Sequence, residues 1–234
     1  MSSHLVPKGL EAFNPAQLGD MFNDKAWKGE LPFRDEFLAL GEAKISRRHV
    51  FDAFRACPQK GVTWAIVWGY PRGKISHFDG VGADALRAIG HAAKFAEVVS
   101  NVGIRSLPTA HDLIQTLNKV SKGAGTSTTT KIAYFSSSYV REGQCLIFDK
   151  QVIKAIFMSS DRALMPLRNA IVPDGMRSSD PVDDLITKAT ESNMQAKLYG
   201  RYLKEINALS FRLGKRHPRD KIEQFLFAKG RGDI

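Results

Sequence analysis

Two glycines and a run of hydroxyl residues stand directly before a lysine in the segment KGAGTSTTTKIAYF, residues 122–135. Gly123 and Gly125 let backbone N–H groups approach an anion closely, and a helix that begins just after them directs its positive end toward that anion. A phosphate is therefore the first ligand that this segment predicts. The alternative is structural: Gly123 ends one helix, and Thr126 or Ser127 caps the next.

The position of the lysine distinguishes this segment from a nucleotide-binding P-loop. A P-loop places a lysine and a Ser or Thr directly after its second glycine. Here Gly125 is followed by Thr126 and Ser127, and Lys131 comes six residues after Gly125. The segment therefore does not match a P-loop.

The charge of the chain indicates the same class of ligand. The 234 residues carry a formal net charge of +10, and such an excess is typical of proteins that bind a polyanion, nucleic acid first among them. The basic residues lie in several distant segments, which indicates a folded basic face; these are 44–55, 70–74, 118–123 and 211–221. A surface made basic only for solubility is the alternative.

Composition disfavours several other classes of protein and site. No run of about 18 apolar residues is present, and residues 1–13 lack the apolar core of a signal peptide, so we expect a cytoplasmic protein with no membrane partner. Cys57 and Cys145 are too few for a four-cysteine zinc or iron–sulfur site. Because no cluster of acidic or His ligands is evident, no metal site is expected and a metal-dependent nuclease lacks support.

The hydrophobic pattern predicts an all-α chain. Ser46 is placed to cap a helix, Thr109 and Asp112 form a capping-box pattern, and Asp149 opens a helix after the apolar residues CLIF. We expect helices over 15–23, 32–41, 46–56, 83–100, 109–121, 127–138, 149–158, 183–213 and 218–228. Residues 61–82 are expected to form a short element followed by a surface loop, and residues 159–181 a loop. Only 64–68 and 144–148 could be strands, and each is short enough to be a helix or a turn in the core.

The order of helix, Gly-x-Gly hairpin, helix, lysine and then an aspartate 18 residues later resembles the helix-hairpin-helix DNA glycosylases between about residues 109 and 157. Within that superfamily, KIAYF, LIFDKQVIKAI and the upstream WGYPRG look most like the 8-oxoguanine DNA glycosylase-like proteins of bacteria. The resemblance implies a two-lobed, all-helical architecture with a DNA-binding cleft. It would be one glycosylase-like domain over 1–234, in which a hairpin and catalytic lobe at about 105–160 packs with N-terminal helices (1–104) and C-terminal helices (161–234).

The resemblance also implies roles for the residues of the hairpin and of the helices beside it. Lys131 would be the nucleophile, a neutral amine that attacks the sugar carbon, displaces the base and forms a Schiff base. Asp149 would stabilise the positive charge that develops on the sugar, although the residue could also be a plain N-cap. A phosphate of double-stranded DNA would be held by the hairpin residues Lys122, Gly123, Gly125, Thr126 and Ser127. A monovalent cation could take part there; no other cofactor and no obligate protein partner is expected.

The spacing of Lys131 departs from the family in one respect. Its separation from Asp149 matches, but in the lysine-bearing members the nucleophile falls two residues after the second glycine, which here is Ser127. Because four residues are about one helical turn, Ser127 and Lys131 share a helix face roughly 6 Å apart along the axis. Either the hairpin is longer and Lys131 is the nucleophile, or the lysine is displaced and Asp149 acts with water.

Aromatic and basic residues outside the hairpin complete the expected site. Trp64, Trp68 and Tyr70 could line a base pocket by stacking. Contacts to DNA phosphates are expected from Arg47 and Arg48, beside His49 at a helix start, and from Arg72 and Lys74. We expect Tyr199 and Tyr202 to lie in the core or to line the cleft.

Two substrates and one different class of function stay open. The family suggests 8-oxoguanine, excised in DNA repair by an enzyme that can also be an AP lyase. The polar, glycine-rich residues 69–82 could instead admit a bulky group such as the sugar on hydroxymethylcytosine, so that the enzyme would act in antiviral defence against phage DNA. A non-catalytic DNA-binding module that keeps only the hairpin is the alternative without chemistry.

Overall fold

A computed structural model describes most of the chain, namely residues 6–15, 18, 20–27, 31–41, 44–70, 74–75, 83–84, 89–104, 109–120, 125–136 and 145–234. The regular elements among these residues are almost all helices, which confirms the all-α prediction. The chain divides into two compact units, one of residues 18–145 and one of residues 1–17 with 146–234. The boundary between the units falls inside the lobe expected at about 105–160.

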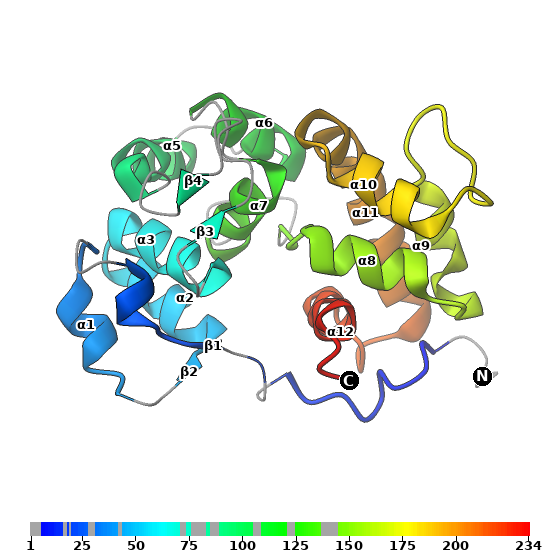
Figure 1. Cartoon of the computed structure of the whole chain (residues 1–234), viewed down its shortest axis with the longest axis horizontal. Coiled ribbons are helices and arrows are strands. Elements are labelled where there is room, and N and C mark those ends of the chain that lie inside the picture. The colour runs from blue at the N-terminus through cyan, green and yellow to red at the C-terminus, as the bar shows by residue number, and fades with distance from the viewer. Residues whose placement is uncertain are drawn as a thin grey trace. The chain divides into compact units, whose positions relative to one another are not determined.

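The unit of residues 18–145 has helix α3 at its centre (Figure 1). α3 packs against α2, α5 and α7, and α6 packs against α5 and α7. Every residue of α3 from Gly61 to Trp68 is buried, as expected of a helix with neighbours on several sides. The possible strand at 64–68 is therefore helix. The helices are α1 (Arg34–Leu38), α2 (Arg47–Ala56), α3 (Pro58–Gly69), α5 (Ala92–Ile104), α6 (Ala110–Val120) and α7 (Thr126–Phe135), with a 3-10 turn at Asp24–Trp27.

Two short antiparallel strand pairs belong to the same unit. β1 (Asp20–Met21) pairs with β2 (Lys44–Ile45), and β3 (Lys74–Ile75) pairs with β4 (Ala83–Asp84). Each strand has two residues, so these pairs join segments of chain rather than form a sheet layer.

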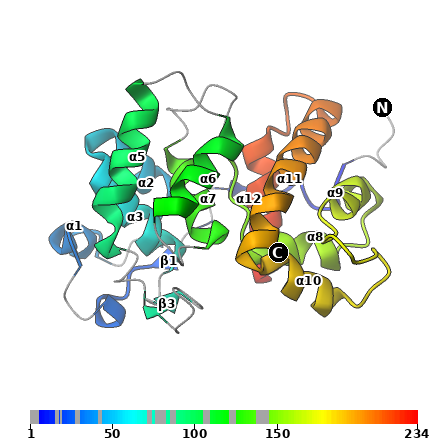
Figure 2. The ribbon, with the colours of Figure 1, turned by 90° about the horizontal axis from the view of Figure 1, so that it is seen from above.

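The second unit contains the long helix α11, which Figures 1 and 2 show beside α10. α8 packs against α10 and α12, and α11 also contacts α9 and α12. A Cβ atom at Gly230 of α12 would overlap the backbone carbonyl oxygen of Gln151 in α8, so the glycine permits this close helix contact. The elements are α8 (Lys150–Met158), a 3-10 turn (Arg162–Leu164), α9 (Met165–Ala170), α10 (Val182–Thr190), α11 (Ser192–Leu213) and α12 (Arg219–Arg231).

Three predicted helix starts are confirmed by their capping hydrogen bonds. The Ser46 hydroxyl accepts from the backbone N–H of His49, whose Nδ1 accepts from the Ser46 N–H. Thr109 and Asp112 form the corresponding reciprocal pair before α6. Asp149 is the N-cap of α8. Capping joins residues two or three apart, which is why the sequence alone reveals it.

Four expected elements are wrong. Asp20–Met21 lie in a strand rather than in a helix over 15–23, and Ala83–Asp84 lie in a strand rather than at the start of a helix over 83–100. Asp20–Met21 pair with Lys44–Ile45, and Ala83–Asp84 pair with the nearer Lys74–Ile75. The expected loop 159–181 contains α9, which begins at Met165 and has Pro166 in its first turn, where proline is compatible with a helix. The expected helix 183–213 is interrupted at Glu191, whose extended backbone ends α10 and precedes α11.

Candidate functional site

Helix α7 carries the lysine of the candidate site. Its N-cap is Gly125, with φ −61° and ψ 161°, and no side chain caps it, so neither Thr126 nor Ser127 takes the capping role. The hydroxyl run is largely buried and forms hydrogen bonds inside the unit: Thr129 Oγ1, for example, donates to Asn118 Oδ1 of α6 at 2.7 Å. The first turn of α7 is thus anchored to the neighbouring helix. Lys122 and Gly123 lie outside the described residues.

Lys131 is buried, with 3% of its surface exposed. Its Nζ donates to Ser127 Oγ at 3.0 Å and to the Ser127 carbonyl oxygen at 3.4 Å. The side chain therefore runs back along α7 by one turn, in the direction in which helical side chains point. The amine of Lys131 therefore lies beside the side chain of Ser127, the other position considered for the nucleophile in the sequence.

The end of α3 packs beside the Lys131 side chain. A Cβ atom at Gly69 would lie 2.6 Å from Lys131 Cδ and 3.0 Å from Cε, so the absence of a side chain at Gly69 makes room for the lysine stem. Lys131 Nζ lies 5.3 Å from the ring centre of Tyr70. The hydroxyls of Tyr70 and Thr128 are 2.7 Å apart in a hydrogen bond in which either can donate. The side chain of Lys131 thereby lies between its own helix, α7, and the end of α3.

The two tryptophans expected in a base pocket are buried in the core of their unit, each with 5% of its surface exposed. Trp64 stacks on Phe37, with ring centres 4.2 Å apart and an angle of 27° between the planes. Trp68 meets Phe135 edge to face at 5.2 Å. Tyr70, in contrast, contacts the lysine of the candidate site.

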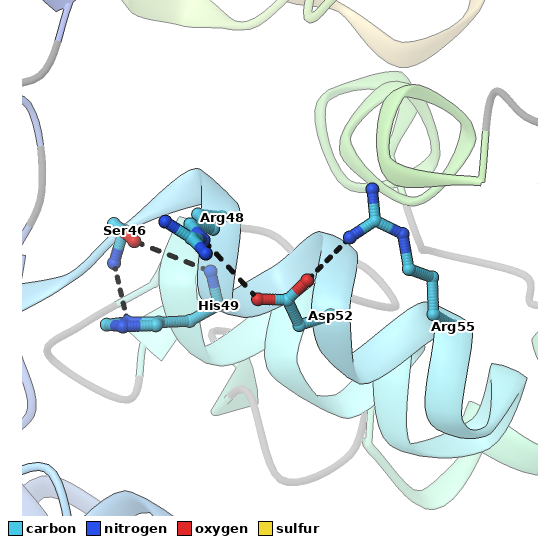
Figure 3. Close-up of polar contacts among 5 residues, drawn as sticks. All are labelled: Ser46, Arg48, His49, Asp52 and Arg55. Carbon is cyan, nitrogen blue, oxygen red and sulfur yellow. Dashed lines mark hydrogen bonds and ion pairs between the residues drawn. The ribbon is translucent and has the colours of Figure 1, made fainter.

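Arg47 and Arg48, expected to contact phosphate, and the neighbouring His49 have different surroundings at the start of α2. The Arg47 guanidinium is buried, with its centre 5.1 Å from the Trp68 ring and 4.7 Å from the Tyr134 ring. The Arg48 side chain is 89% exposed and lies 3.8 Å from Asp52. His49 takes part in the capping box, as Figure 3 shows together with the ion pairs of Asp52.

Of these three residues, Arg48 thus presents its charge to solvent, whereas Arg47 packs against aromatic rings. The other two expected phosphate contacts lie farther along the chain. Lys74 is part of β3, and Arg72 lies outside the described residues.

Asp149, in the second unit, is a buried N-cap with 5% of its surface exposed. Its Oδ1 accepts from the backbone N–H groups of Gln151 at 3.0 Å and Val152 at 3.2 Å. These bonds fix the orientation of the carboxylate at the start of α8. Lys131 and Asp149 belong to different units of the chain.

The residues before Asp149 form neither helix nor strand, yet Cys145–Phe148 are completely buried. Polar side chains of α11 bond four backbone groups of Leu146–Phe148. Tyr199 bonds the N–H and the C=O of Leu146 (both 3.2 Å), Tyr202 donates to the C=O of Ile147 (3.2 Å), and Gln195 donates to the C=O of Phe148 (2.6 Å).

Sequence reasoning placed the two tyrosines in the core or the cleft, and the structure places them in the core. Gln195 was missed. The spacing of Gln195, Tyr199 and Tyr202 by four and then three residues is the signal that could have revealed them, since it puts them on one face of a helix.

A family model matches residues 11–227, and it identifies the chain as a protein of the DNA glycosylase type. The model is described as "Putative 8-oxoguanine DNA glycosylase OGG-like protein", and the chain belongs to this family. The resemblance inferred from the hairpin, Lys131 and Asp149 is confirmed at the level of the family. No match was found among curated proteins or among solved structures.

The family implies a protein that binds DNA. Within the part of the chain that the structure describes, no helix is both long and apolar enough to cross a membrane.

Proposed function

We propose that the protein is a glycosylase that excises a modified base from double-stranded DNA, with Lys131 as its nucleophile. The observation that carries this proposal is the position of the Lys131 amine, which is buried and lies 3.0 Å from Ser127 Oγ in the first turn of α7. In the lysine-bearing members of the family, the nucleophile occupies the sequence position that Ser127 has here. Membership in the family supplies the class of reaction.

In the proposed reaction, the target nucleotide is first rotated out of the duplex, because its sugar and base are not accessible inside the stack. The neutral Nζ of Lys131 attacks C1′ of the sugar, and the bond from C1′ to the base breaks. The base leaves with the bonding electrons and takes up a proton. Loss of a proton from the nitrogen and opening of the sugar ring give a Schiff base.

Two fates of the Schiff base correspond to two kinds of enzyme. Water can hydrolyse it, which restores the lysine and leaves an abasic site. Alternatively, β-elimination before hydrolysis breaks the DNA strand, which is the AP lyase reaction. We propose base excision as the principal activity and lyase activity as its consequence when hydrolysis is slow.

We further propose that Asp149 is the carboxylate that stabilises the positive charge on the sugar. Its support is the fixed orientation of the carboxylate, which two backbone N–H groups hold at the start of α8. The start of α7 is proposed to hold a DNA phosphate through Gly125, Thr126 and Ser127, because a helix N-terminus presents N–H groups to an anion. Lys122 and Gly123 would complete this contact.

The substrate is proposed on two grounds, each of which favours a different base. The family description favours 8-oxoguanine and a role in repair. The polar, glycine-rich residues 69–82 favour a base with a bulky substituent, such as glucosylated hydroxymethylcytosine in phage DNA, and a role in antiviral defence. Mass spectrometry of the base released from both kinds of DNA decides between them, since each DNA yields a base of different mass.

Borohydride trapping tests the nucleophile. The wild-type protein should form a covalent adduct with DNA that carries the modified base, and Lys131→Gln should abolish both the adduct and base release. Lys94→Gln is the matched control, because Lys94 lies exposed on α5 of the same unit, outside the basic segments, and its loss changes the net charge equally. If base release survives in Lys131→Gln, the enzyme uses water and the lysine is not the nucleophile.

A second pair of variants tests the carboxylate. Asp149→Asn retains an oxygen that can accept the capping bonds, so fold and DNA affinity should persist while turnover falls by about 10²–10³. Asp161→Asn is the matched control, because Asp161 caps the 3-10 turn of the same unit by a similar bond to Ala163 N–H. Full activity in Asp149→Asn would remove this residue from the mechanism. If DNA binds but no modified base is ever released, the protein is a non-catalytic DNA-binding module.

A further inference from the structure

One polar face of α11 has no part in the function proposed so far. Gln195, Tyr199 and Tyr202 are 3%, 0% and 0% exposed, and each makes a hydrogen bond to the backbone of the segment that leads to Asp149. We propose that these three residues, which we call the α11 clamp, position the Asp149 carboxylate for the reaction. This inference rests on the proposed role of Asp149.

The backbone of residues 146–148 explains why polar side chains are needed at these positions. The segment is buried and forms neither helix nor strand, and within the described residues no strand pairs with it. A buried C=O group without a hydrogen bond is costly, so its partners must come from side chains or water. The clamp supplies one partner to each of three successive residues, and it thereby fixes the path of the chain up to Asp149.

Packing alone does not account for the clamp. A phenylalanine at Tyr199 or Tyr202 would bury the same ring without placing a hydroxyl in the core, where an unsatisfied hydroxyl is unfavourable. The Tyr202 ring also stacks on Phe148, with centres 4.5 Å apart, and this contact would survive loss of the hydroxyl. The hydroxyls therefore add hydrogen bonds to the backbone rather than buried volume.

Gln195 is the member that bonds the residue directly before Asp149. It donates at 2.6 Å to the C=O of Phe148, which belongs to the peptide bond that joins Phe148 to Asp149. It thus orients the peptide plane directly before the Asp149 Cα atom. On the other side, the carboxylate is held by the N–H groups of Gln151 and Val152. Asp149 is consequently fixed from both directions along the chain.

The test compares Gln195→Met with Ile206→Val, a substitution at another buried position of α11 that makes no bond to residues 146–149. Methionine keeps a side chain of similar length but cannot donate to the Phe148 carbonyl. Tyr202→Phe serves as a milder second variant if Gln195→Met folds poorly. The excision rate of each variant is measured well below the melting temperature of that variant, so that a loss of stability does not reduce the folded fraction.

Hydrogen exchange gives a readout that does not depend on activity. In Gln195→Met the amides of Gln151 and Val152 should exchange faster, because the displaced Asp149 caps them less well, and in Ile206→Val they should not. In single-turnover excision, Gln195→Met should lose about tenfold to a hundredfold in rate, as expected when a reacting group is misplaced by about 1 Å. Its Kd for DNA should stay within about twofold of the wild-type value.

A double mutant separates failure of this inference from failure of the proposed function. In an Asp149→Asn background, Gln195→Met should cause no further loss of rate, because its effect passes through the carboxylate. Two outcomes overturn the clamp and leave the proposed function standing. One is that the losses of rate from Gln195→Met and Asp149→Asn are additive. The other is that Gln195→Met and Tyr202→Phe keep the wild-type rate while Asp149→Asn is inactive. Full activity in Asp149→Asn overturns the clamp together with the proposed role of Asp149.

Discussion

Replacement of Gly69 by alanine should greatly lower the rate of base release with little effect on the fold. Gly69 is the last residue of α3, and an added Cβ would lie 2.6 Å from Lys131 Cδ and 3.0 Å from Cε. Carbon atoms in contact prefer about 3.5–4.0 Å, so the lysine stem must move by roughly 1 Å. The amine is two bonds beyond Cδ and should leave its position 3.0 Å from Ser127 Oγ.

The expected loss follows from that displacement. A reacting group misplaced by about 1 Å costs on the order of 10²-fold in rate. Stability should change less: alanine in a helix is favoured over glycine by roughly 0.5–1 kcal/mol, while overpacking costs about 1–3 kcal/mol. The net loss of stability is therefore about 0–2.5 kcal/mol, which leaves the protein folded at moderate temperature.

Single-turnover base release and borohydride trapping measure the effect, and thermal unfolding monitors the fold. Gly90→Ala is the matched control, because a Cβ atom at Gly90 meets nothing within 4 Å in the same unit. We expect Gly90→Ala to release base at the wild-type rate. If Gly69→Ala does the same, and traps DNA equally well, the position of the Lys131 side chain does not govern the chemistry.

Four further perturbations test the site and the fold. Ser127→Ala removes the 3.0 Å acceptor of Lys131 Nζ, so base release should fall by about tenfold with DNA affinity unchanged; an equal rate would show that Ser127 does not hold the amine. DNA affinity should fall by about 10³-fold between 50 and 200 mM salt if roughly six phosphates are contacted, and Gly125→Val should weaken binding to all duplexes alike, whereas salt-independent affinity argues against backbone recognition. Burial, and to a smaller extent the charge of Lys221, lowers the pKa of His217 from its ordinary value of 6.5. As the pH falls below that value, His217 therefore takes up a proton in the unfolded chain but not in the folded chain, which destabilises the fold. Denaturant unfolding should therefore show a smaller loss of stability between pH 7.5 and 5.5 in His217→Gln than in the wild type; equal losses would contradict this.

Local features of the site could be predicted from the sequence. Ser46, Thr109 and Asp149 mark helix starts because capping bonds join neighbours in the chain, and all three caps are present. The family followed from the order of hairpin, Lys131 and Asp149, and it is confirmed. The caps and the recognition of the family depend on residues close together in sequence.

Features that depend on distant partners could not be predicted. Arg47 has the sequence of an exposed helix start, yet Trp68 and Tyr134 from two other helices enclose its guanidinium. Asp20–Met21, expected within a helix over 15–23, form a strand instead, because they pair with residues more than twenty positions away. Charge and periodicity carry no information about such partners.

The sequence by itself determined that this is a basic, all-α chain of a DNA glycosylase family, with Lys131 one turn from Ser127 and Asp149 at a helix start. Only the tertiary structure decided that Gly69 makes room for the lysine stem and that Gln195 holds the peptide before Asp149. The physical reason is that composition, capping and helical spacing are local properties, whereas the position of a buried side chain depends on the atoms that pack against it from elsewhere in the chain.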